Sequence, residues 1–459
     1  MSRDSANQNM VKQDIVKIAS SIAEQARADE QIEAYVSRST TLDIRAFNGE
    51  VEYLVSAASA GVGIRVISGH RQGFAYCGYL DDEAIKKTLS DARDNALFAN
   101  EDIHASMAYP DEVEAIQMDL LDPAIASTPV SDKTRMVVEL EKDARKSDPR
   151  IRQVDSADYS DVTGEAAICN SNGVQAYSEG SYCDISVSVI AGDGPDSQTG
   201  TGFSVARKFA LLDRDAAMND AVTRAVRLLG ATKPTTRECT VVFDPRVTAT
   251  LISVVGSALS GESVTKGRSF LANRVGEKVM SSALSLIDDP TDSRALSADR
   301  YDDEGLASRR NELVRDGVLL GFVYDSTSAS RAGVQSTASG VRAGYASGPV
   351  AACRALLLSG RETSTFEDVV TRVHDGLYVQ SVTGVHSGVN PISGDFSVGI
   401  EGIIIRDGAL AEPVREATIA STLQKMLLSI AHVADDVQWL PGNAAGQTIA
   451  ISGMMLSGN

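Results

Sequence analysis

The chain has 459 residues and a formal net charge of −19, and apolar residues make up 43% of it. This length and composition predict a globular protein of two or three domains. The acidic excess argues against a nucleic-acid partner and against docking on an anionic membrane, because both need clustered Lys and Arg.

Targeting signals and cysteine usage point to the cytoplasm. The opening residues, MSRDSANQNMVKQDIVKIAS, are polar and then amphipathic, without the apolar core of a secretory signal. No run approaches the ~20 apolar residues that a membrane-spanning helix needs. The five cysteines are scattered and none forms a C-x-x-C pair, which predicts reduced thiols rather than disulfides or a structural zinc site.

The first part of the chain predicts an α+β domain over residues 1–110. Apolar residues recur at helical spacing over 12–29 and again over 82–99. Between these segments lie short runs rich in Val, Ile, Tyr and Phe, and Asn48-Gly49 is a strong hairpin signal. We therefore expect an antiparallel sheet flanked by two helices.

A second unit is expected over residues 120–232, after an acidic linker bracketed by prolines. Helical patterns cover 131–147 and 213–230. The intervening segment alternates apolar and polar residues and contains the hairpin dipeptide Asn172-Gly173.

The remainder, residues 236–459, predicts a β-rich C-terminal domain. Its strand patterns include two hairpins that turn on Asp316-Gly317 and Asp407-Gly408. Residues 416–433 are the clearest helical pattern in its last part. The whole chain is therefore predicted to be α+β, with mostly antiparallel sheets and flanking helices.

Searches for a complete catalytic set give a negative result. The chain has only five His, none is followed by Glu, and no two can share one helix face as zinc ligands do. G-x-S-x-G is absent. His386 has Ser387, Ser393 and Asp395 close in sequence, but a catalytic triad is assembled in space. A glycine-rich turn region is the interpretation that we favour here.

The acidic run Asp302-Asp303-Glu304, which precedes a glycine, has two interpretations. Three adjacent carboxylates could bind a hard cation through their oxygens. A solvated loop is the more common role of such a run, and it is the one we expect.

The order of motifs in the C-terminal half carries a family resemblance. VVFDP leads into LISVVGSALSGE, followed by SFLANRVGEKVMSS, LIDDP, YDDEG and NELVRDGVLLGFVYD. GVNPISGDFSVGIEGIIIRDGAL, PVREATIASTLQKMLLSIAHVADD and IAISGMML come later, and GVGIRVISGHRQGFAY stands near the N-terminus. This series resembles the TldD/PmbA family of modulators of DNA gyrase, which are predicted peptidases. The resemblance covers nearly the whole chain.

The resemblance also implies a branch of that family. TldD-type members carry HExxxH on a helix and a late cysteine that completes a zinc site, whereas PmbA (TldE) members lack this set. Counting back without gaps from Gly276-Glu277, the positions of the first His, the Glu and the second His fall on Ile252, Ser253 and Ser257. The late segment LPGNAAGQTIAISG has no cysteine. Isoleucine cannot ligate a metal, and serine is a poor zinc ligand and base.

The resemblance thus implies a non-catalytic, PmbA/TldE-like subunit that forms a heterodimer with a TldD-like HExxxH subunit and processes unfolded or modified peptides. No cofactor is expected in this chain, and zinc is expected in the partner. Peptide binding by strand addition would use the Gly-rich strands around 382–399. The candidate groove residues are Gly384, His386, Ser393, Gly394 and Asp395.

Two alternatives stay open. One is an independent hydrolase that uses the His386 region. The other is a homodimeric peptide-binding or scaffold protein.

Overall fold

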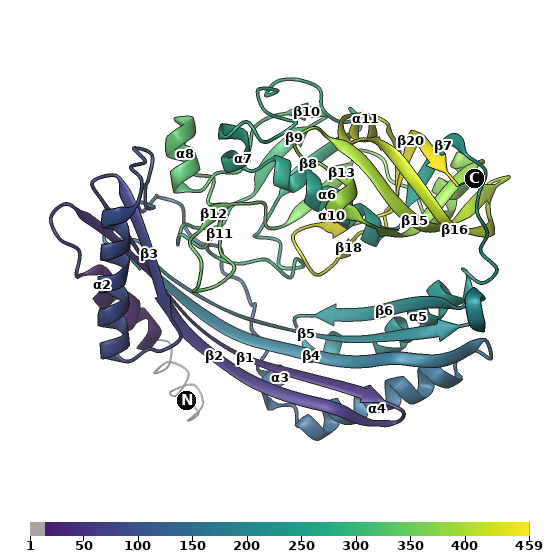
Figure 1. Cartoon of the computed structure of the whole chain (residues 1–459), viewed down its shortest axis with the longest axis horizontal. Helices are drawn as coiled ribbons and strands as arrows, with labels where there is room; N and C mark the ends of the chain where they lie inside the picture. Colours follow the sequence, from purple (N-terminus) through teal and green to yellow (C-terminus); the bar gives the residue numbers. More distant parts are fainter. Residues whose placement is uncertain (1–13, 459) are drawn as a thin grey trace.

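The computed structural model describes residues 14–458 as a long, curved sheet that faces a β-rich C-terminal domain (Figure 1). The sheet is antiparallel throughout, with the strand order β3-β2-β1-β4-β5-β6. Its strands are β1 (Glu30–Phe47), β2 (Glu50–Ser68), β3 (Arg71–Cys77), β4 (Ile151–Asn170), β5 (Gln175–Ala191) and β6 (Gln198–Ala206).

Strands from both of the first two expected domains form this sheet. β1 and β4 pair without interruption, from Glu33 opposite Asn170 to Ala46 opposite Ala157. The hairpin at Asn48-Gly49 joins β1 to β2, as the sequence predicted. The boundary expected between residues 110 and 120 stays a prediction, and the two segments on either side of it share one sheet.

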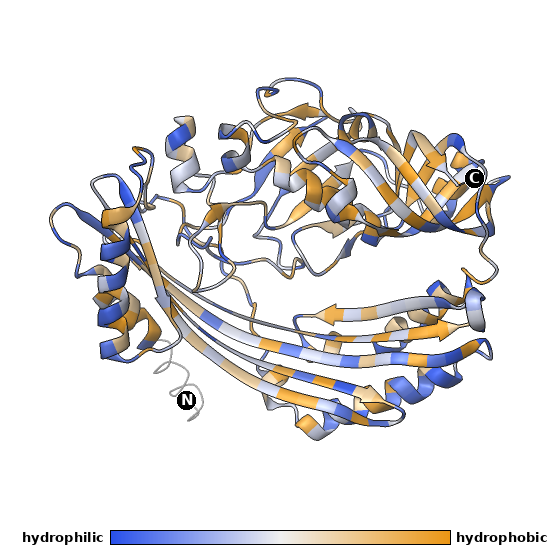
Figure 2. Ribbon diagram, viewed as in Figure 1, coloured by the Kyte–Doolittle hydropathy of each residue, from blue (hydrophilic) through white to orange (hydrophobic). Residues whose placement is uncertain are grey.

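Helices cover the face of the sheet that is turned away from the C-terminal domain. Even-numbered residues of β1, from Ile32 to Ala46, point to this face because side chains alternate along a strand. A helix over residues 14–23 and α2 (Asp82–Phe98) pack on one half of that face, α4 (Val130–Lys146) and α5 (Arg214–Val226) on the other, and the short α3 (Pro123–Ser127) lies beside α4. In Figure 2, orange and blue bands alternate along the strands, as expected for a sheet with one covered face.

The helices predicted over 82–99, 131–147 and 213–230 are therefore confirmed. The helix predicted over 12–29 is seen over residues 14–23, and its first two residues lie outside the described part of the chain.

The C-terminal domain contains a closed barrel. Its strand order is β16-β15-β14-β7-β20, and β16 returns to pair with β20, with Thr418 opposite Ser457. Only β7 and β14 run parallel; β17 adds to the far side of β20. The strands are β7 (Arg237–Phe243), β14 (Gly376–Thr383), β15 (Asp395–Arg406), β16 (Ala409–Thr422), β17 (Ile430–Val433) and β20 (Ile449–Ser457).

Smaller elements surround the barrel. A four-stranded sheet has the order β10-β9-β8-β13, and two short pairs join β11 to β12 and β18 to β19. These strands are β8 (Leu284–Asp288), β9 (Asn311–Arg315), β10 (Val318–Leu319), β11 (Gly340–Val341), β12 (Val350–Ala351), β13 (Leu356–Gly360), β18 (Gln438–Trp439) and β19 (Ala445–Gly446). The helices are α6 (Pro245–Ala258), α7 (Gly261–Thr265), α8 (Ser326–Ala332), α9 (Phe366–Val373), α10 (Val385–Gly388) and α11 (Leu423–Leu428).

The helix predicted over residues 416–433 is wrong. The first part continues β16, and Thr418, Ile419 and Ala420 pair with both β15 and β20. Only α11 is helical, and β17 follows it. The apolar spacing forms a helix over only one to two turns, in α11. The residues before α11 form a strand instead, because they close the barrel by pairing with β20.

The predicted class, α+β with mostly antiparallel sheets and a β-rich C-terminal domain, is confirmed. None of the five cysteines forms a disulfide. Over residues 14–458, no helix combines the length and apolar character that crossing a membrane would require.

Candidate functional site

Helix α6 follows the barrel strand β7 directly, and a buried aspartate fixes its first turn. Asp244 caps the helix by accepting a hydrogen bond from the Arg246 backbone N–H at 3.0 Å. Its other carboxylate oxygen accepts from the Tyr378 hydroxyl at 2.6 Å and from Arg224 of α5 at 2.8 Å. The helix is therefore anchored both to the barrel and to a helix of the large sheet.

The two faces of α6 have different roles. Ile252 has no exposed surface and packs in the barrel core with Leu251 and Val255. Ser253 is half-buried and Ser257 is exposed. Residues four apart share one helix face, so these two serines form a polar stripe on the side away from the core.

The late segment of the chain lies against this polar stripe. The Ser253 hydroxyl donates to the Asn443 side-chain oxygen at 2.7 Å, and the Asn443 amide donates to the Cys353 carbonyl at 3.3 Å. The Cys353 thiol in turn lies 3.8 Å from the Gly256 carbonyl. A Cβ on Gly256 would lie 2.5 Å from the Leu356 side chain of β13 and 3.8 Å from the Asn443 amide, so the helix packs tightly against β13 and touches the late segment.

These groups do not fit a zinc ion. Zinc sites in proteins use imidazole, thiolate and carboxylate ligands. Ile252 has no lone pair, and Ser253 is engaged with Asn443. Burial raises the pKa of the Cys353 thiol well above its ordinary value, which disfavours the thiolate. Across the described residues, no cluster of three or more His, Cys, Asp or Glu is placed to hold a metal ion.

His386 lies on α10, a single helical turn that begins after Gly384. Gly384 has a φ of 76°, the left-handed conformation that glycine adopts at least cost. His386 and Ser387 are both exposed, and the Ser387 hydroxyl donates to the Gly384 carbonyl at 3.2 Å. That hydroxyl is thus part of the turn and is not activated by the imidazole.

The second half of this region is a turn as well. The Ser393 hydroxyl donates to Asp395 at 2.7 Å, and both side chains are exposed. Gly394 is buried under Gln424, whose amide donates to the Ser393 carbonyl at 2.9 Å. A bridge between Val389 and Phe396 holds the two halves together. The five candidate residues therefore share one surface region, and in the described chain no serine hydroxyl donates to His386.

The Gly-rich strands next to these turns are mostly inner strands of the barrel. β14 pairs with β15 along its length, but with β7 only from Gly376 to Val379. β7 ends there because the chain enters α6, and the Asp244 N–H donates to the Val379 carbonyl. Within residues 14–458, no strand consequently pairs with residues 381–383 on that side.

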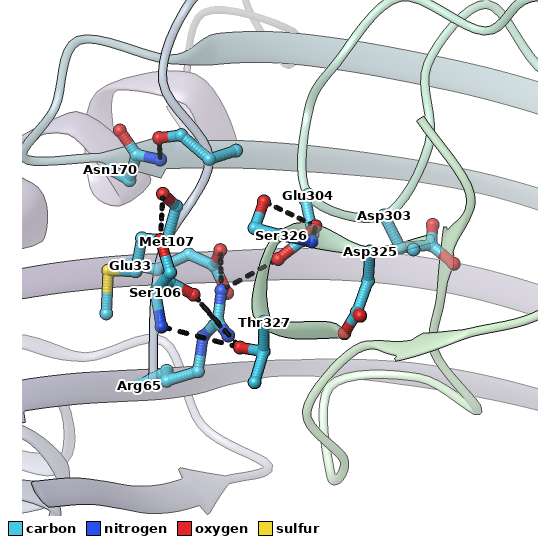
Figure 3. Close-up of polar contacts among 12 residues, drawn as sticks. Glu33, Arg65, Ser106, Met107, Asn170, Asp303, Glu304, Asp325, Ser326 and Thr327 are labelled. Atoms are coloured by element: carbon cyan, nitrogen blue, oxygen red, sulfur yellow. Dashed lines mark hydrogen bonds and ion pairs between the residues drawn. The ribbon is translucent and has the colours of Figure 1, made fainter. Parts of the chain in front are cut away.

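A buried ion network joins the large sheet to the C-terminal domain (Figure 3). Arg65 of β2 is 2% exposed and bonds to Glu33 of β1 at 2.7 Å and to Glu304 at 3.2 Å. Arg342 pairs with Glu33 from the other side. Glu304 also accepts from the backbone and the hydroxyl of Ser326, at 2.7 and 2.8 Å.

The solvated loop predicted for Asp302-Asp303-Glu304 is therefore wrong. Asp302 is 2% exposed and Glu304 is not exposed at all. Asp302 accepts backbone N–H groups, among them that of Gly340 at 2.9 Å, and Asp303 pairs with Arg354 at 2.8 Å. Burial raises the pKa of Asp302 and of Glu304. Arg65 pairs with Glu304 and Arg354 with Asp303, whereas backbone N–H groups hold Asp302. These arginines lie far away in sequence and could not be identified from the spacing of the acids.

A pocket of about 400 Å³ lies beside this network, between the large sheet and the C-terminal domain. Sheet residues such as Tyr35 and Arg38 line one side, and Asp299 and Arg354 line the other. The residues that line it carry charges of both signs.

Sequence reasoning missed the two residues that complete the environment of α6, Asn443 and Cys353. The late segment was singled out only for its lack of a cysteine. The structure places Asn443 of that segment on Ser253.

Models of three consecutive domains match the chain. The PmbA/TldA metallopeptidase domain 1 matches residues 32–96, the central domain matches 123–229, and the C-terminal domain matches 236–458. Together they cover most of the chain.

Curated relatives are similar over nearly the full length. The Metalloprotease PmbA homolog of Haemophilus influenzae is 28% identical, with 94% of this chain and 93% of the relative aligned. Metalloprotease PmbA of Escherichia coli O157:H7 is 27% identical over 88% of each chain. The Metalloprotease TldD homolog of Haemophilus influenzae is 27% identical over 82% of this chain and 79% of that protein.

Solved structures share the fold. A modulator of DNA gyrase from Thermotoga maritima, described as putative, superposes with a TM-score of 0.87 at 22% identity, over 97% of this chain and 100% of the other. TldE from Thermococcus kodakarensis gives the same TM-score and identity, over 97% of this chain and 99% of the other.

Proposed function

This chain belongs to the PmbA/TldD metallopeptidase family, and on that premise we propose that it is a PmbA/TldE-like subunit without a catalytic centre of its own. In this proposal it pairs with a TldD-like subunit that carries HExxxH and the zinc ion. The pair acts as a cytoplasmic metalloprotease on unfolded or modified peptides.

The polar face of α6 is the observation that carries the proposal. Ile252 is committed to the core, and Ser253 and Ser257 offer hydroxyls where metal ligands and a general base would be needed. Asn443 occupies the late segment, where a thiolate would have to complete a zinc site. The side chains of this region can hold the helix in place, but they cannot activate water.

The similarity to both PmbA and TldD proteins supports a pairing of two related subunits. Chains of one fold that diverge in their catalytic residues can form an assembly in which only one member carries the chemistry. The other member then supplies peptide-binding surface and encloses the site.

The peptide groove is proposed at the turn region and the neighbouring strand. In the described part of the chain, residues 381–383 have no strand on one side, and this side is where we place strand addition by an extended peptide. The neighbouring Gly384 and His386 are exposed, as are Ser393 and Asp395, while Gly394 shapes the turn beneath them. Backbone pairing gives affinity with little dependence on peptide sequence, as suits unfolded substrates.

Co-expression with a TldD-like HExxxH subunit tests this function. The two chains should elute together in size-exclusion chromatography, with one zinc per pair, and cleave unfolded peptide in a chelator-sensitive manner. The purified single chain should bind no stoichiometric zinc and cleave nothing. Zinc bound stoichiometrically by this chain, or failure to associate with any HExxxH subunit, would overturn the proposal.

A further inference from the structure

Another pocket, of about 390 Å³, lies where strand β6 and helix α5 meet the C-terminal domain. Strand β18 and the first turn of α6 line it from that domain, and Figure 1 shows β18 on the side that faces the large sheet. Its largest apolar residues and its charged residues are Phe203, Trp439, Leu440, Asp220, Arg224 and Arg246. Apolar walls with a few converging polar groups are typical of small-ligand pockets.

Two arginines of this pocket share one acidic residue of its lining. Asp220 pairs with Arg224 at 2.9 Å and with Arg246 at 2.5 Å. Arg224 has a second partner in the buried Asp244, at 2.8 Å, whereas Arg246 donates its other hydrogen bond to the Thr201 carbonyl at 2.7 Å. The lining therefore carries two cations and one anion.

Arg246 is the cation that can accept a further partner. Within the described chain, its contacts with Asp220 and Thr201 occupy two of the five N–H groups of the guanidinium. Burial and the neighbouring Arg224 cation lower the pKa of Arg246, so an additional anion beside it would be stabilised.

Aromatic rings supply the apolar part of the same pocket. The Arg246 guanidinium lies over the Phe203 ring, 4.1 Å from its centroid, which helps to hold the cation in place. Trp439 packs against a cluster of buried alanines and also lines the pocket. Its indole N–H is shielded from solvent and donates to no group within residues 14–458. Buried indole N–H groups usually have an acceptor, and here the described chain supplies none.

The pocket adjoins the region in which peptide binding is proposed. Arg224 donates to the Gln380 carbonyl at 3.3 Å, and Gln380 directly precedes residues 381–383. Arg246 stands seven residues before Ser253 on α6, which is about 10 Å along the helix axis. A peptide strand beside residues 381–383 therefore lies next to the wall of this pocket.

We propose that this pocket binds the C-terminal residue of a peptide, with its α-carboxylate on Arg246 and a large apolar side chain against Phe203 and Trp439. A carboxylate suits Arg246 because hydrogen bonds between two charged groups are strong and the planar guanidinium orients them. A large apolar side chain suits the rings because both lose contact with water. This inference rests on the proposed function and deepens it, since it names the end of the peptide that this subunit holds.

Calorimetric titration of the purified full chain with short peptides tests the assignment. The tetrapeptide Ala-Ala-Ala-Phe should bind at least about tenfold more tightly than its C-terminal amide, which lacks the charged oxygen pair. It should exceed Ala-Ala-Ala-Gly by a similar factor, because glycine buries no side chain. Trp439 is the only tryptophan of the chain, so a shift of its fluorescence on binding reports where the peptide lies.

Two arginine variants test the role of Arg246. Arg246→Met should reduce the preference for the free acid over the amide to within about twofold. Arg415→Met is the matched control and should keep the preference of the wild type. Arg415 also extends from the C-terminal domain to a backbone carbonyl and a carboxylate, those of Pro195 at 3.0 Å and Asp196 at 3.5 Å, but it does not line the pocket. Thermal melting establishes that both variants are folded, and the comparison of acid with amide on the wild type needs no variant.

Four results would overturn the proposal: no binding, equal affinity for the acid and the amide, equal affinity for the two free acids, or binding that leaves the Trp439 emission unchanged. An acid preference that survives in folded Arg246→Met would do the same. Association with an HExxxH subunit is measured separately. A chain that associates without binding these peptides refutes only this inference, and one that binds them without associating refutes only the proposed function.

Discussion

Ser253 on helix α6 donates a 2.7 Å hydrogen bond to Asn443, which lies 190 residues further along the chain. The contact joins the helix that would carry HExxxH to the late segment that would carry the zinc-binding cysteine. In this chain the two segments carry a hydroxyl and a carboxamide at this contact, and these two groups are hydrogen-bonded to each other. The contact is therefore structural, and it motivates the predictions that follow.

Replacement of Ile252 tests whether α6 acts as a core helix. Ile252→Ala should lower the free energy of unfolding by about 2–5 kcal/mol, because it removes a fully buried side chain and leaves a cavity. Ser257→Ala, on the exposed face of the same helix, should change it by less than about 0.5 kcal/mol. Chemical denaturation of both variants measures the difference. Equal effects would contradict the assignment of the two faces.

The buried ion network between the large sheet and the C-terminal domain should contribute strongly to the free energy of unfolding. Arg65→Met leaves Glu304 buried without its cation and Glu33 with Arg342 alone, and should cost about 3–5 kcal/mol in denaturant unfolding. Arg135→Met removes an exposed ion pair with Asp132 and should cost at most about 1 kcal/mol. A loss of similar size in both variants would show that the network contributes no more than a surface pair.

Asp288 predicts a specific pH dependence of stability. Burial raises its pKa to about 6, while one carboxylate oxygen accepts the backbone N–H groups of Arg354 and Ala355. Because the folded chain holds this proton more tightly than the unfolded chain does, the contribution of Asp288 to stability is present below about pH 4. It is lost as the pH rises through 6, by about 3 kcal/mol in total.

Asp288→Asn keeps the shape of the side chain and remains neutral, so its unfolding free energy should fall less between pH 4 and pH 7. Urea unfolding across this pH range checks the slope. Asp91→Asn, at an exposed position of α2, is the control and should follow the wild-type curve. Parallel curves for Asp288→Asn and the wild type would refute the assignment.

His386 distinguishes the proposed groove from an independent active site. In the complex with an HExxxH subunit, His386→Ala should raise KM severalfold and leave kcat within about twofold, because an exposed side chain that only contacts peptide contributes to binding. A general base would instead lose at least 100-fold in kcat. Peptide-cleavage kinetics of the variant complex separate these cases, and loss of kcat alone would favour the hydrolase alternative.

Local sequence patterns predicted much of the fold. Asn48-Gly49, Asp316-Gly317 and Asp407-Gly408 each form the expected turn, because a tight hairpin needs two residues that tolerate positive φ. The amphipathic helices α2, α4 and α5 were also predicted, since each buries one apolar stripe on the sheet.

Local sequence patterns could not predict the contacts between segments that are distant in the chain. Nothing local to residues 416–422 indicates that they close a barrel with β20, so a short apolar repeat suggested a helix there. Likewise, the acidic run looks solvated in the sequence, and only the fold brings Arg65 to Glu304 and Arg354 to Asp303. The same limit applies to Asn443 on Ser253, because which groups meet in space decides their chemistry.

Zinc analysis combined with peptide cleavage tests the central claim most directly. We expect the purified chain to contain less than 0.1 equivalent of zinc (roughly the background of adventitious metal for a chain without a ligand set) and to be inactive. Its complex with an HExxxH subunit should cleave peptide. Glu→Gln within HExxxH should abolish that activity, whereas Ser253→Ala in this chain should retain it. One tightly bound zinc in the chain alone, or activity that is lost with Ser253→Ala and survives the Glu→Gln change, would contradict the account.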